Sequence, residues 1–381
     1  MAESGISMEK KLLIVNSFCG VGSTGRICSQ IAEEYSKKGY TCRIAYGRDP
    51  AVNAHKDITY KIGTKADIYI HGGLSRMSGR HGCYSQRATK VFLKWADAFN
   101  PDVIWLHNLH GYYLNFEMLF AWIKSRPFMK VRWTLHDCWA FTGHCTYFSM
   151  IGCDKWKNLC FKCPQKDSYP ASYLIDSCED NFRRKKTAFC GVQNMTIIVP
   201  SQWLANLVKE SFMQDYPVEI IYNIVDMNMF KPTTSTIRED LRIGDKFMIL
   251  GVATDWDKRK GLDDFIELSK MIDEKTIIVL VGLKAAQIKK LPKNIIGVER
   301  TDSQEELAGY YTEADVFLNP SKEETFGMTT LEAQYCGTQA VVYKNTACEE
   351  VAKKFGGMAV EQSVEELYNT VMKIKQENGG I

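Results

Sequence analysis

The chain has 381 residues, of which 45% are hydrophobic and 24% are charged. These proportions are typical of a folded protein of about two domains and exclude a disordered chain. The net charge is +3, and no stretch has the ~18 uncharged apolar residues of a membrane span, so an integral membrane protein is excluded.

Short apolar runs predict buried strands of parallel sheets. The predicted strands are 11–15, 42–46, 103–106, 131–135 and 195–199, followed by 247–252, 276–281, 295–298, 316–319 and 339–342. Amphipathic segments separate them, such as 27–38, which carries Ile27, Ile31 and Tyr35 on one face. Two such series predict an α/β fold of two doubly wound, Rossmann-like halves.

A stretch ending in proline, 222–232, is the expected hinge. We therefore expect an N-terminal domain over 1–222 and a C-terminal domain over 223–381, with the last helix, 364–375, packing on either domain. Residues 1–222 hold 28 Lys and Arg against 19 Asp and Glu, whereas 223–381 hold 20 against 26. The first half is therefore basic and the second acidic. The opening residues lack the apolar centre of a signal peptide, which predicts a cytoplasmic protein.

A glycine-rich turn, Gly20–Gly25, follows the first predicted strand and fits the pattern G-x-G-x-x-G. Such turns bind phosphates through backbone N–H groups at a helix N-terminus, which makes Gly22 and Gly25 donor-binding candidates. The fit to a dinucleotide fingerprint is imperfect, because four residues separate the strand from the first glycine. A purely structural turn is the alternative.

Two glutamates, Glu324 and Glu332, are separated by seven residues after the predicted strand 316–319. A helix is expected to begin near Gly327, so its free N–H groups should face a phosphate or a sugar hydroxyl. Glu324 is expected to accept hydrogen bonds from the sugar, and Glu332 from a ribose diol. Two solvated glutamates are the alternative. The remaining donor-binding candidates of this loop are Phe326, Gly327, Met328, Thr329 and Thr330.

A basic turn follows the predicted strand 247–252. Its cations Lys258, Arg259 and Lys260 precede Gly261. Positive charge at the carboxyl end of a strand suits a diphosphate leaving group, so Lys260 and Arg259 are candidates for stabilising it. A solvated turn is the alternative.

These three elements, in this order on two α/β halves, resemble the GT-B glycosyltransferases and specifically glycosyltransferase family 4. The stretches 199–203 (VPSQW) and 222–226 (YNIVD) are similar to two further motifs of that family. The resemblance implies two Rossmann-like domains facing a central cleft. It also implies that Glu324 contacts the donor sugar, Glu332 the ribose and Lys260 the diphosphate. Asp255 stands near the position of the family's arginine, and Arg259 is the available substitute.

Histidines follow two predicted strands: His107 and His110 come after 103–106, and His136 comes after 131–135. Side chains at the carboxyl ends of parallel strands face the ligand crevice. The resemblance assigns the family's cleft histidine to His136, which joins Glu324 and Lys260 as catalytic candidates. His107, His110 and Asp137 are acceptor-side candidates, and a structural role is the alternative.

Four of the 13 cysteines lie close together in a loop spanning 138–163: Cys145, Cys153, Cys160 and Cys163. Four thiols could hold a structural zinc tetrahedrally. Buried free thiols are the alternative.

Together these features predict a retaining, hexosyltransferase-type glycosyltransferase. It would move a sugar from a UDP- or GDP-sugar to a glycan or lipid-linked saccharide in surface polysaccharide biosynthesis, without a catalytic cofactor. The stretch 134–145 is similar to a subgroup that builds such polysaccharides. The alternatives are a GT-B-shaped nucleotide-sugar epimerase and a nucleotide-binding protein without transferase activity.

The basic first half predicts docking at the inner face of an anionic membrane, through the cations of 183–186, Arg126 and Lys130 and a surface-exposed Phe128 and Met129. For 183–186 a solvated helix face is the alternative. No nucleic-acid partner is expected, because no recognition motif accompanies the charge.

Overall fold

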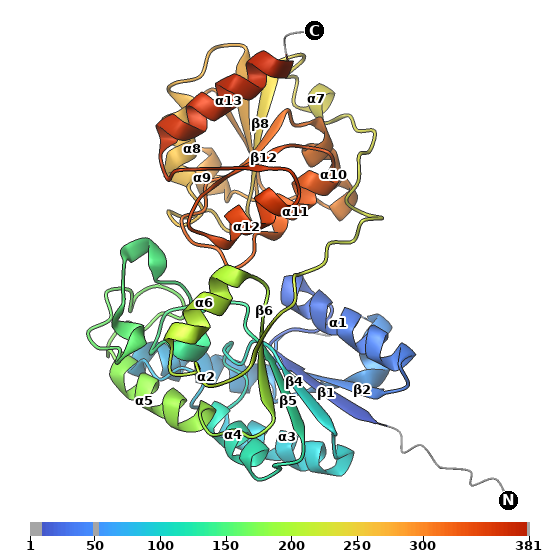
Figure 1. The fold of residues 1–381 in the computed structure, drawn as a ribbon, viewed down its shortest axis with the longest axis vertical. Coiled ribbons are helices and arrows are strands. Elements are labelled where there is room, and N and C mark those ends of the chain that lie inside the picture. The colour runs from blue at the N-terminus through green and yellow to red at the C-terminus, as the bar shows by residue number, and fades with distance from the viewer. Residues whose placement is uncertain (1–9, 49–52, 379–381) are drawn as a thin grey trace, which may run out of the picture. The chain divides into compact units, whose positions relative to one another are not determined.

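The computed structural model describes residues 10–48 and 53–378 (Figure 1). The expectation about a signal peptide falls on the first residues, which lie outside the described ones. The chain forms two compact units. The first comprises the described residues up to Phe148, with Gly152–Pro200 and Leu204–Ile221. The second comprises Ser149–Ile151, Ser201–Trp203 and the described residues from Tyr222 onward.

The first unit is built on a seven-stranded parallel sheet of order β3-β2-β1-β4-β5-β6-β7. Its strands are β1 (Lys11–Asn16), β2 (Thr41–Tyr46), β3 (Thr59–Lys61), β4 (Val103–Leu106), β5 (Lys130–Thr134), β6 (Met195–Val199) and β7 (Val218–Ile220). Leu106 of β4 pairs with Val15 of β1 and with Trp133 of β5. The carboxyl ends of these three strands therefore meet at one edge of the sheet.

Helices connect these strands, as parallel pairing requires. They are α1 (Gly22–Lys37), α2 (Lys65–Ser78), α3 (Gln86–Phe99), α4 (Phe116–Lys124), α5 (Cys178–Phe189) and α6 (Gln202–Glu210), with a 3₁₀ helix η1 at Asn53–Ile58. The cysteine-rich loop contains only short 3₁₀ turns: η2 (Trp139–Phe141), η3 (Ser149–Ile151) and η4 (Lys155–Lys157).

The second unit has a six-stranded parallel sheet of order β10-β9-β8-β11-β12-β13. Its strands are β8 (Phe247–Val252), β9 (Thr276–Val281), β10 (Ile295–Val298), β11 (Val316–Asn319), β12 (Ala340–Tyr343) and β13 (Met358–Val360). Its helices are α7 (Ile237–Asp240), α8 (Leu262–Ser269), α9 (Ala285–Ile288), α10 (Gln304–Glu313), α11 (Met328–Tyr335), α12 (Ala347–Lys354) and α13 (Val364–Asn378). The predicted α/β fold of two doubly wound parallel sheets is confirmed.

The last helix, α13, packs within the second unit. Leu367, Val371 and Ile374 are buried in a core of this unit, and Lys375 lies 2.7 Å from a carboxylate oxygen of Asp273. Of the two placements that the sequence left open, the structure shows this one.

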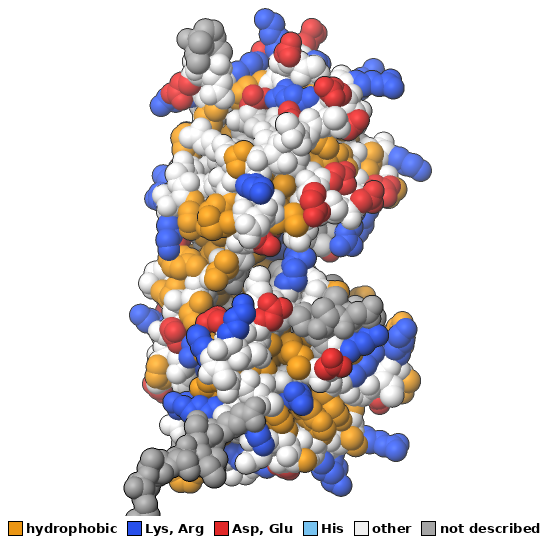
Figure 2. All heavy atoms as spheres, turned by 90° about the vertical axis from the view of Figure 1, so that its right-hand side faces the viewer, with side chains coloured by type: hydrophobic (Ala, Val, Ile, Leu, Met, Phe, Trp, Pro, Cys, Tyr) orange, Lys and Arg blue, Asp and Glu red, His pale blue; other side chains and the backbone are white. Residues whose placement is uncertain are grey.

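The surface corrects part of the predicted membrane site. Met129 and Lys185, both expected at the surface, are 5% and 1% exposed. On the face shown in Figure 2, acidic and basic side chains are interspersed on each unit. None of the helices in the described residues has the length and apolar character needed to cross a bilayer.

Candidate active site

Two glycines shape the candidate donor site at the carboxyl end of β11. Gly261 and Gly327 have positive φ values of 76° and 89°. A Cβ on Gly261 would lie 2.5 Å from the carbonyl oxygen of Pro320, and one on Gly327 would lie 2.6 Å from the Sγ of Cys348. Glycine is therefore required at both positions, and the basic turn packs directly against the loop after β11.

The predicted catalytic pair of this unit is in contact. Lys260 Nζ pairs with the carboxylate of Glu324, and Arg259 Nη1 lies 3.8 Å from the same oxygen. Burial opposes the charge of this carboxyl, but Lys260 and Arg259 outweigh it and lower the pKa of Glu324. Glu324 is therefore ionised at neutral pH and able to accept hydrogen bonds from hydroxyl groups.

The second glutamate, Glu332, lies on α11 and is 8% exposed. Its Oε2 accepts a hydrogen bond from the hydroxyl of buried Tyr311, at 2.9 Å. Tyr311 belongs to α10, twenty-one residues earlier, and the sequence motif gave no sign of it. This bond fixes the carboxylate on a helix that begins directly after Gly327.

The other donor-binding candidates divide by burial. Phe326 and Thr330 are 2% and 0% exposed, so neither side chain is open to a ligand. The hydroxyl of Thr330 accepts a hydrogen bond from the Asn319 side chain at 2.9 Å, which ties α11 to β11. Met328 and Thr329 are partly exposed at the helix start.

The acceptor-side candidates gather in the first unit, where β4 and β5 end. His107 Nδ1 and His136 Nε2 lie 2.9 Å apart, and their rings stack with centroids 5.2 Å apart. His110 Nε2 lies 2.8 Å from an oxygen of Asp137, and its Nδ1 lies 3.1 Å from the hydroxyl of Tyr169. Tyr169 was not predicted, because it lies far along the chain in an irregular segment.

Burial controls the charge at this edge. It lowers the pKa of His136 to about 4 and that of His107 well below its usual range, so both imidazoles are neutral at pH 7. Burial would raise the pKa of Asp137, but His110 and the Trp139 N–H outweigh it and lower that pKa. The result is an ionised carboxylate beside neutral imidazoles, in a small, partly open cavity where β4 and β5 end. Its polar lining suits the hydroxyl groups of a ligand.

The glycine-rich turn lies at the same edge of this sheet. Gly20 and Gly22 have positive φ, and the N–H of Gly20 donates to the carbonyl of Gly25 at 3.1 Å. The side-chain oxygen of Asn16 accepts from the N–H of Asn108 at 3.2 Å, which joins this turn to the end of β4. The turn and the histidines therefore share one edge of the first unit. The donor-binding roles of Gly22 and Gly25 stay predictions.

The cysteines of the loop also converge. The Sγ atoms of Cys145 and Cys163 lie 3.5 Å apart, and Cys153 and Cys160 line the same cavity. Cys178 of α5 joins them, although the sequence spacing did not include it. Among residues 10–48 and 53–378, no group of three or more His, Cys, Asp or Glu side chains is arranged so that it could hold a metal ion. Zinc binding therefore stays a prediction.

Two family models match the chain. The model described as Glycosyltransferase Family 4 matches residues 24–228, which is more than half of the chain. The model described as Glycosyl transferases group 1 matches residues 233–379. The first match covers the histidine edge and the cysteine-rich loop, and the second covers the Lys260–Glu324 pair.

Two relatives of this chain are named for polysaccharide or glycolipid synthesis. A protein of Escherichia coli K12 named for colanic acid biosynthesis, the glycosyl transferase WcaC, is 24% identical over 301 residues, covering 73% of this chain and 68% of its own. The alpha-galactosylglucosyldiacylglycerol synthase of Streptococcus pneumoniae is 31% identical over 157 residues, covering 37% of this chain and 41% of its own. The chain thus spans less than half of the second relative.

Among solved structures, HepE of Anabaena in complex with UDP and glucose is similar in fold. Its TM-score is 0.63 at 15% identity, covering 97% of this chain and 90% of that one. At this identity the likeness shows the fold alone.

Proposed function

The chain belongs to glycosyltransferase family 4, and from this premise we propose that it moves a sugar from a UDP- or GDP-sugar to a glycan or lipid-linked saccharide during the assembly of a surface polysaccharide. The observation that carries this proposal is the buried, ionised Glu324, which pairs with Lys260 beside the start of α11. The relative named for colanic acid biosynthesis supports the polysaccharide, and the relative named for a diacylglycerol product supports a lipid-linked acceptor.

The donor would bind the second unit. Lys260, Arg259 and the N–H groups at the start of α11 would neutralise the diphosphate, whose negative charge grows as the glycosidic bond breaks. Because protein cations supply this charge, no catalytic metal is required in the proposal. Glu324 would orient the sugar hydroxyls, and Glu332, held by Tyr311, would accept hydrogen bonds from the ribose. The HepE complex with UDP and glucose supports a nucleotide donor for this fold.

The acceptor would bind the first unit. His136 is neutral, so it would contribute a hydrogen bond to the reacting groups rather than a positive charge. The ionised Asp137 and its partner His110 would hold hydroxyl groups of the acceptor sugar. Retention of configuration, with departure and attack on one face of the sugar, is part of the proposal because the family resemblance implies it. The proposal also includes activity at the cytoplasmic face of the membrane.

Nucleotide binding tests the donor site. Lys260→Met should weaken the affinity for UDP or GDP by about tenfold or more, because the diphosphate loses a charge-assisted contact. The neighbouring Lys258→Met is the matched control, since Lys258 is exposed and outside the Glu324 pair. Calorimetry that finds equal affinities for both variants and the parent would overturn the assignment.

A further inference from the structure

Helix α2 presents an apolar face to the exterior of the first unit. Tyr69, Ile70, Leu74 and Met77 recur at about one helical turn and are between 41% and 78% exposed. The opposite side of the helix is buried. Single exposed apolar residues are ordinary, but several on one helix face mark an interaction surface.

A second exposed apolar segment lies against this helix. Tyr173, Leu174 and Ile175 are between 56% and 69% exposed. The N–H of Tyr173 donates to the carbonyl of Arg76 at 2.8 Å, so the segment is joined to the last turn of α2. We call this combined surface the apolar face; it consists of Tyr69, Ile70, Leu74, Met77, Tyr173, Leu174 and Ile175.

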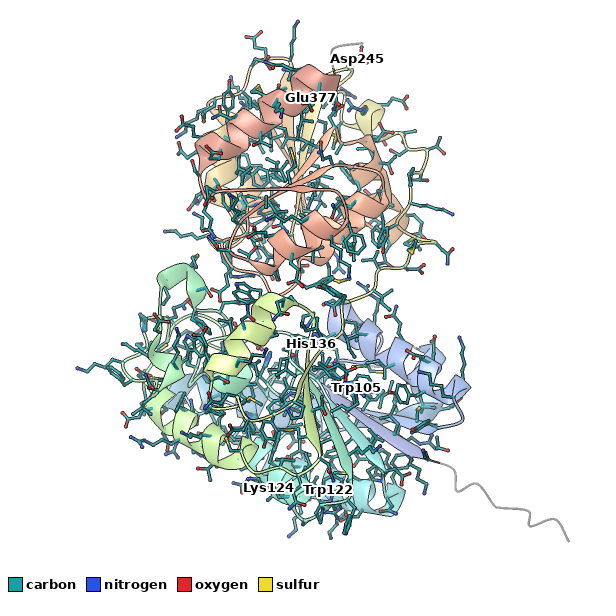
Figure 3. The ribbon with its side chains drawn as sticks, viewed as in Figure 1. Trp105, Trp122, Lys124, His136, Asp245 and Glu377 are labelled. Atoms are coloured by element: carbon teal, nitrogen blue, oxygen red, sulfur yellow. The ribbon has the colours of Figure 1, made fainter. Side chains whose placement is uncertain are left out.

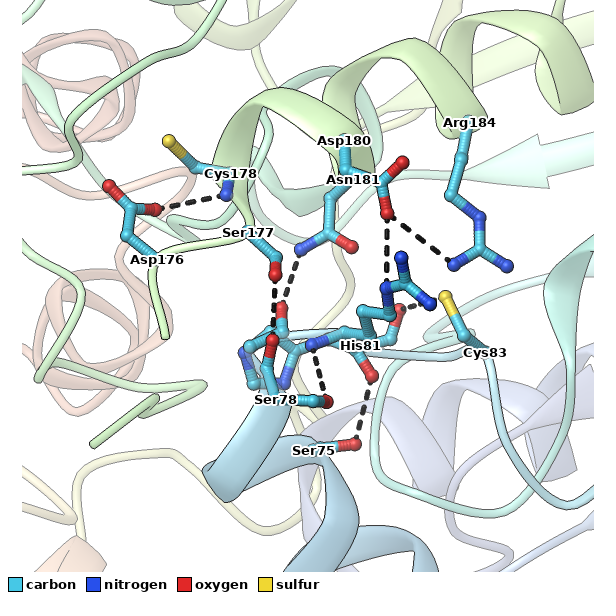
Figure 4. A network of polar contacts seen from close by, with 12 residues as sticks. Ser75, Ser78, His81, Cys83, Asp176, Ser177, Cys178, Asp180, Asn181 and Arg184 are labelled. Carbon is cyan, nitrogen blue, oxygen red and sulfur yellow. Dashed lines mark hydrogen bonds and ion pairs between the residues drawn. The ribbon is translucent and has the colours of Figure 1, made fainter. Parts of the chain in front are cut away.

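A polar network holds the apolar face in place (Figure 4). Asn181 at the start of α5 donates to the carbonyl of Gly79 at 2.6 Å, and Ser177 donates to the carbonyl of Ser78 at 2.7 Å. Arg80 and Asp180 form an ion pair at 3.1 Å. Turning the apolar residues inward would break these contacts, so their exposure belongs to the folded unit.

Unpaired cations accompany the apolar face. Helices α2 and α3 together carry five Lys and Arg against two Asp. Lys65, Arg76 and Arg87 form no salt bridge with any residue that the structure describes. An anionic bilayer matches both features, because apolar side chains insert among the lipids while cations meet the phosphate headgroups.

Two contacts connect the surroundings of the apolar face to the acceptor-side residues. The guanidinium of Arg76, on α2, lies 5.4 Å from the ring centroid of Tyr112, two residues after His110. Tyr169, whose hydroxyl lies 3.1 Å from His110 Nδ1, precedes Tyr173 by four residues. The segments that carry the apolar face are therefore joined to those that hold His110.

The surface predicted from the sequence is less suited to this role. Arg126, Arg183 and Arg184 pair with Asp97, Glu179 and Glu117. Phe128 is 94% exposed, but it precedes β5, whereas His136 follows that strand. Figure 3 shows His136 and Lys124, at the end of α4, at opposite ends of the first unit.

We propose that the apolar face docks on an anionic lipid bilayer and so presents a lipid-linked acceptor to the cavity of His110 and Asp137. The docking is inferred from the exposed apolar residues and the unpaired cations alone. The delivery of the acceptor rests on the proposed function.

Vesicle sedimentation of the full chain tests the docking. The parent should bind phosphatidylcholine vesicles that contain phosphatidylglycerol about tenfold more tightly than pure phosphatidylcholine vesicles, and added salt should weaken the binding. Ile70→Ser with Leu174→Ser should weaken it by about tenfold or more. Phe128→Ser, which removes an exposed apolar side chain that is not part of the apolar face, should leave it unchanged. Lys65→Gln with Arg87→Gln should reduce only the preference for anionic vesicles.

Three results would overturn the docking: absence of vesicle binding by the parent, loss of binding in Phe128→Ser alone, or a dimer in solution that Ile70→Ser with Leu174→Ser dissociates. Calorimetry with UDP and GDP runs in parallel. Circular dichroism and a thermal unfolding transition that match those of the parent show that the apolar variant remains folded. If the parent binds vesicles as expected but binds no nucleotide, the proposed function fails and the docking stands.

Discussion

Glu332 illustrates how one residue is prepared for its role before a ligand arrives. Its carboxylate is bound to the buried hydroxyl of Tyr311, so its position does not depend on the ligand. Holding a side chain in advance reduces the conformational entropy lost on binding. The motif identified the glutamate, but Tyr311 could not be predicted because only the packing of α10 on α11 brings the two together.

Replacing Glu332 tests the ribose contact. Glu332→Ala should weaken UDP or GDP binding by about tenfold or more, since a hydrogen bond to a charged group contributes about 1.5–3 kcal/mol. Glu361→Ala, which removes an exposed carboxylate paired with Lys344, is the control. Titration calorimetry decides, and equal affinities for the two variants would count against the contact.

His81 is a buried histidine whose imidazole lacks hydrogen bonds to the described residues. It is 2% exposed, and neither ring nitrogen has a hydrogen-bond partner among the described residues. Burial first, and then the nearby His144, lower its pKa to about 2. The unfolded chain, with an ordinary histidine pKa, therefore binds one more proton than the folded chain between about pH 2 and pH 6.5.

Because the unfolded chain takes up this proton and the folded chain does not, the folded state loses stability as the pH falls below the histidine pKa of the unfolded chain. His81→Leu removes the group that takes up this proton. Between about pH 6.5 and pH 5, the free energy of unfolding should therefore fall less in the variant than in the parent, by up to about 2 kcal/mol. Denaturant unfolding at both pH values measures the difference. Identical pH slopes for parent and variant would show that His81 is not held neutral by burial.

At the scale of elements, the start of α11 depends on Gly327. Gly356 has nearly the same φ, 88° against 89°, but nothing lies within 4 Å of the place where its Cβ would be. Gly356→Ala should therefore cost only the left-handed strain of about 1–2 kcal/mol.

Gly327→Ala should cost more than this, because its Cβ would also collide with the Sγ of Cys348. The same change should weaken nucleotide binding, since it displaces the first N–H groups of α11. Equal losses of stability in the two variants, with donor affinity intact, would show that the close contact has no role.

The cysteine-rich loop provides a prediction at the same scale. We predict about one zinc per purified chain, because Cys145, Cys153, Cys160 and Cys163 line one cavity and four thiolates are ligands of structural zinc sites. Cys160→Ser with Cys163→Ser should abolish the zinc, whereas Cys190→Ser, outside that cavity, should retain it. Metal analysis by mass spectrometry that finds no zinc in the parent, together with freely titrating thiols, would contradict the prediction.

The central elements of both sheets could be predicted from the sequence, because their strands are continuous apolar runs. The strands β3, β7 and β13 could not, because each has only three residues at a sheet edge, too few for a recognisable strand pattern. Helix α1 shows another limit. This helix buries Cys28 and Ala32 in the core, whereas Ile31 and Tyr35 of the predicted face are only partly buried at the edge of that core. Small residues lie closest to the sheet there, which hydrophobic periodicity alone does not reveal.

For the whole molecule, the near-neutral charge conceals two different halves. The basic half contains the histidine edge and the apolar face, and the acidic half contains the Lys260–Glu324 pair. Of the cations in the surface predicted from composition, Arg126, Arg183 and Arg184 are paired and Lys185 is buried, whereas Lys186 is exposed. Only the folded arrangement identifies which cations remain available.

Nucleotide release from a panel of UDP- and GDP-sugars, measured with and without glycan and lipid-linked acceptors, tests the proposed sugar transfer. We expect one donor to release its nucleotide only when an acceptor is present, and Lys260→Met to abolish this release. Conversion of one nucleotide sugar into another without any acceptor would contradict the proposed transfer.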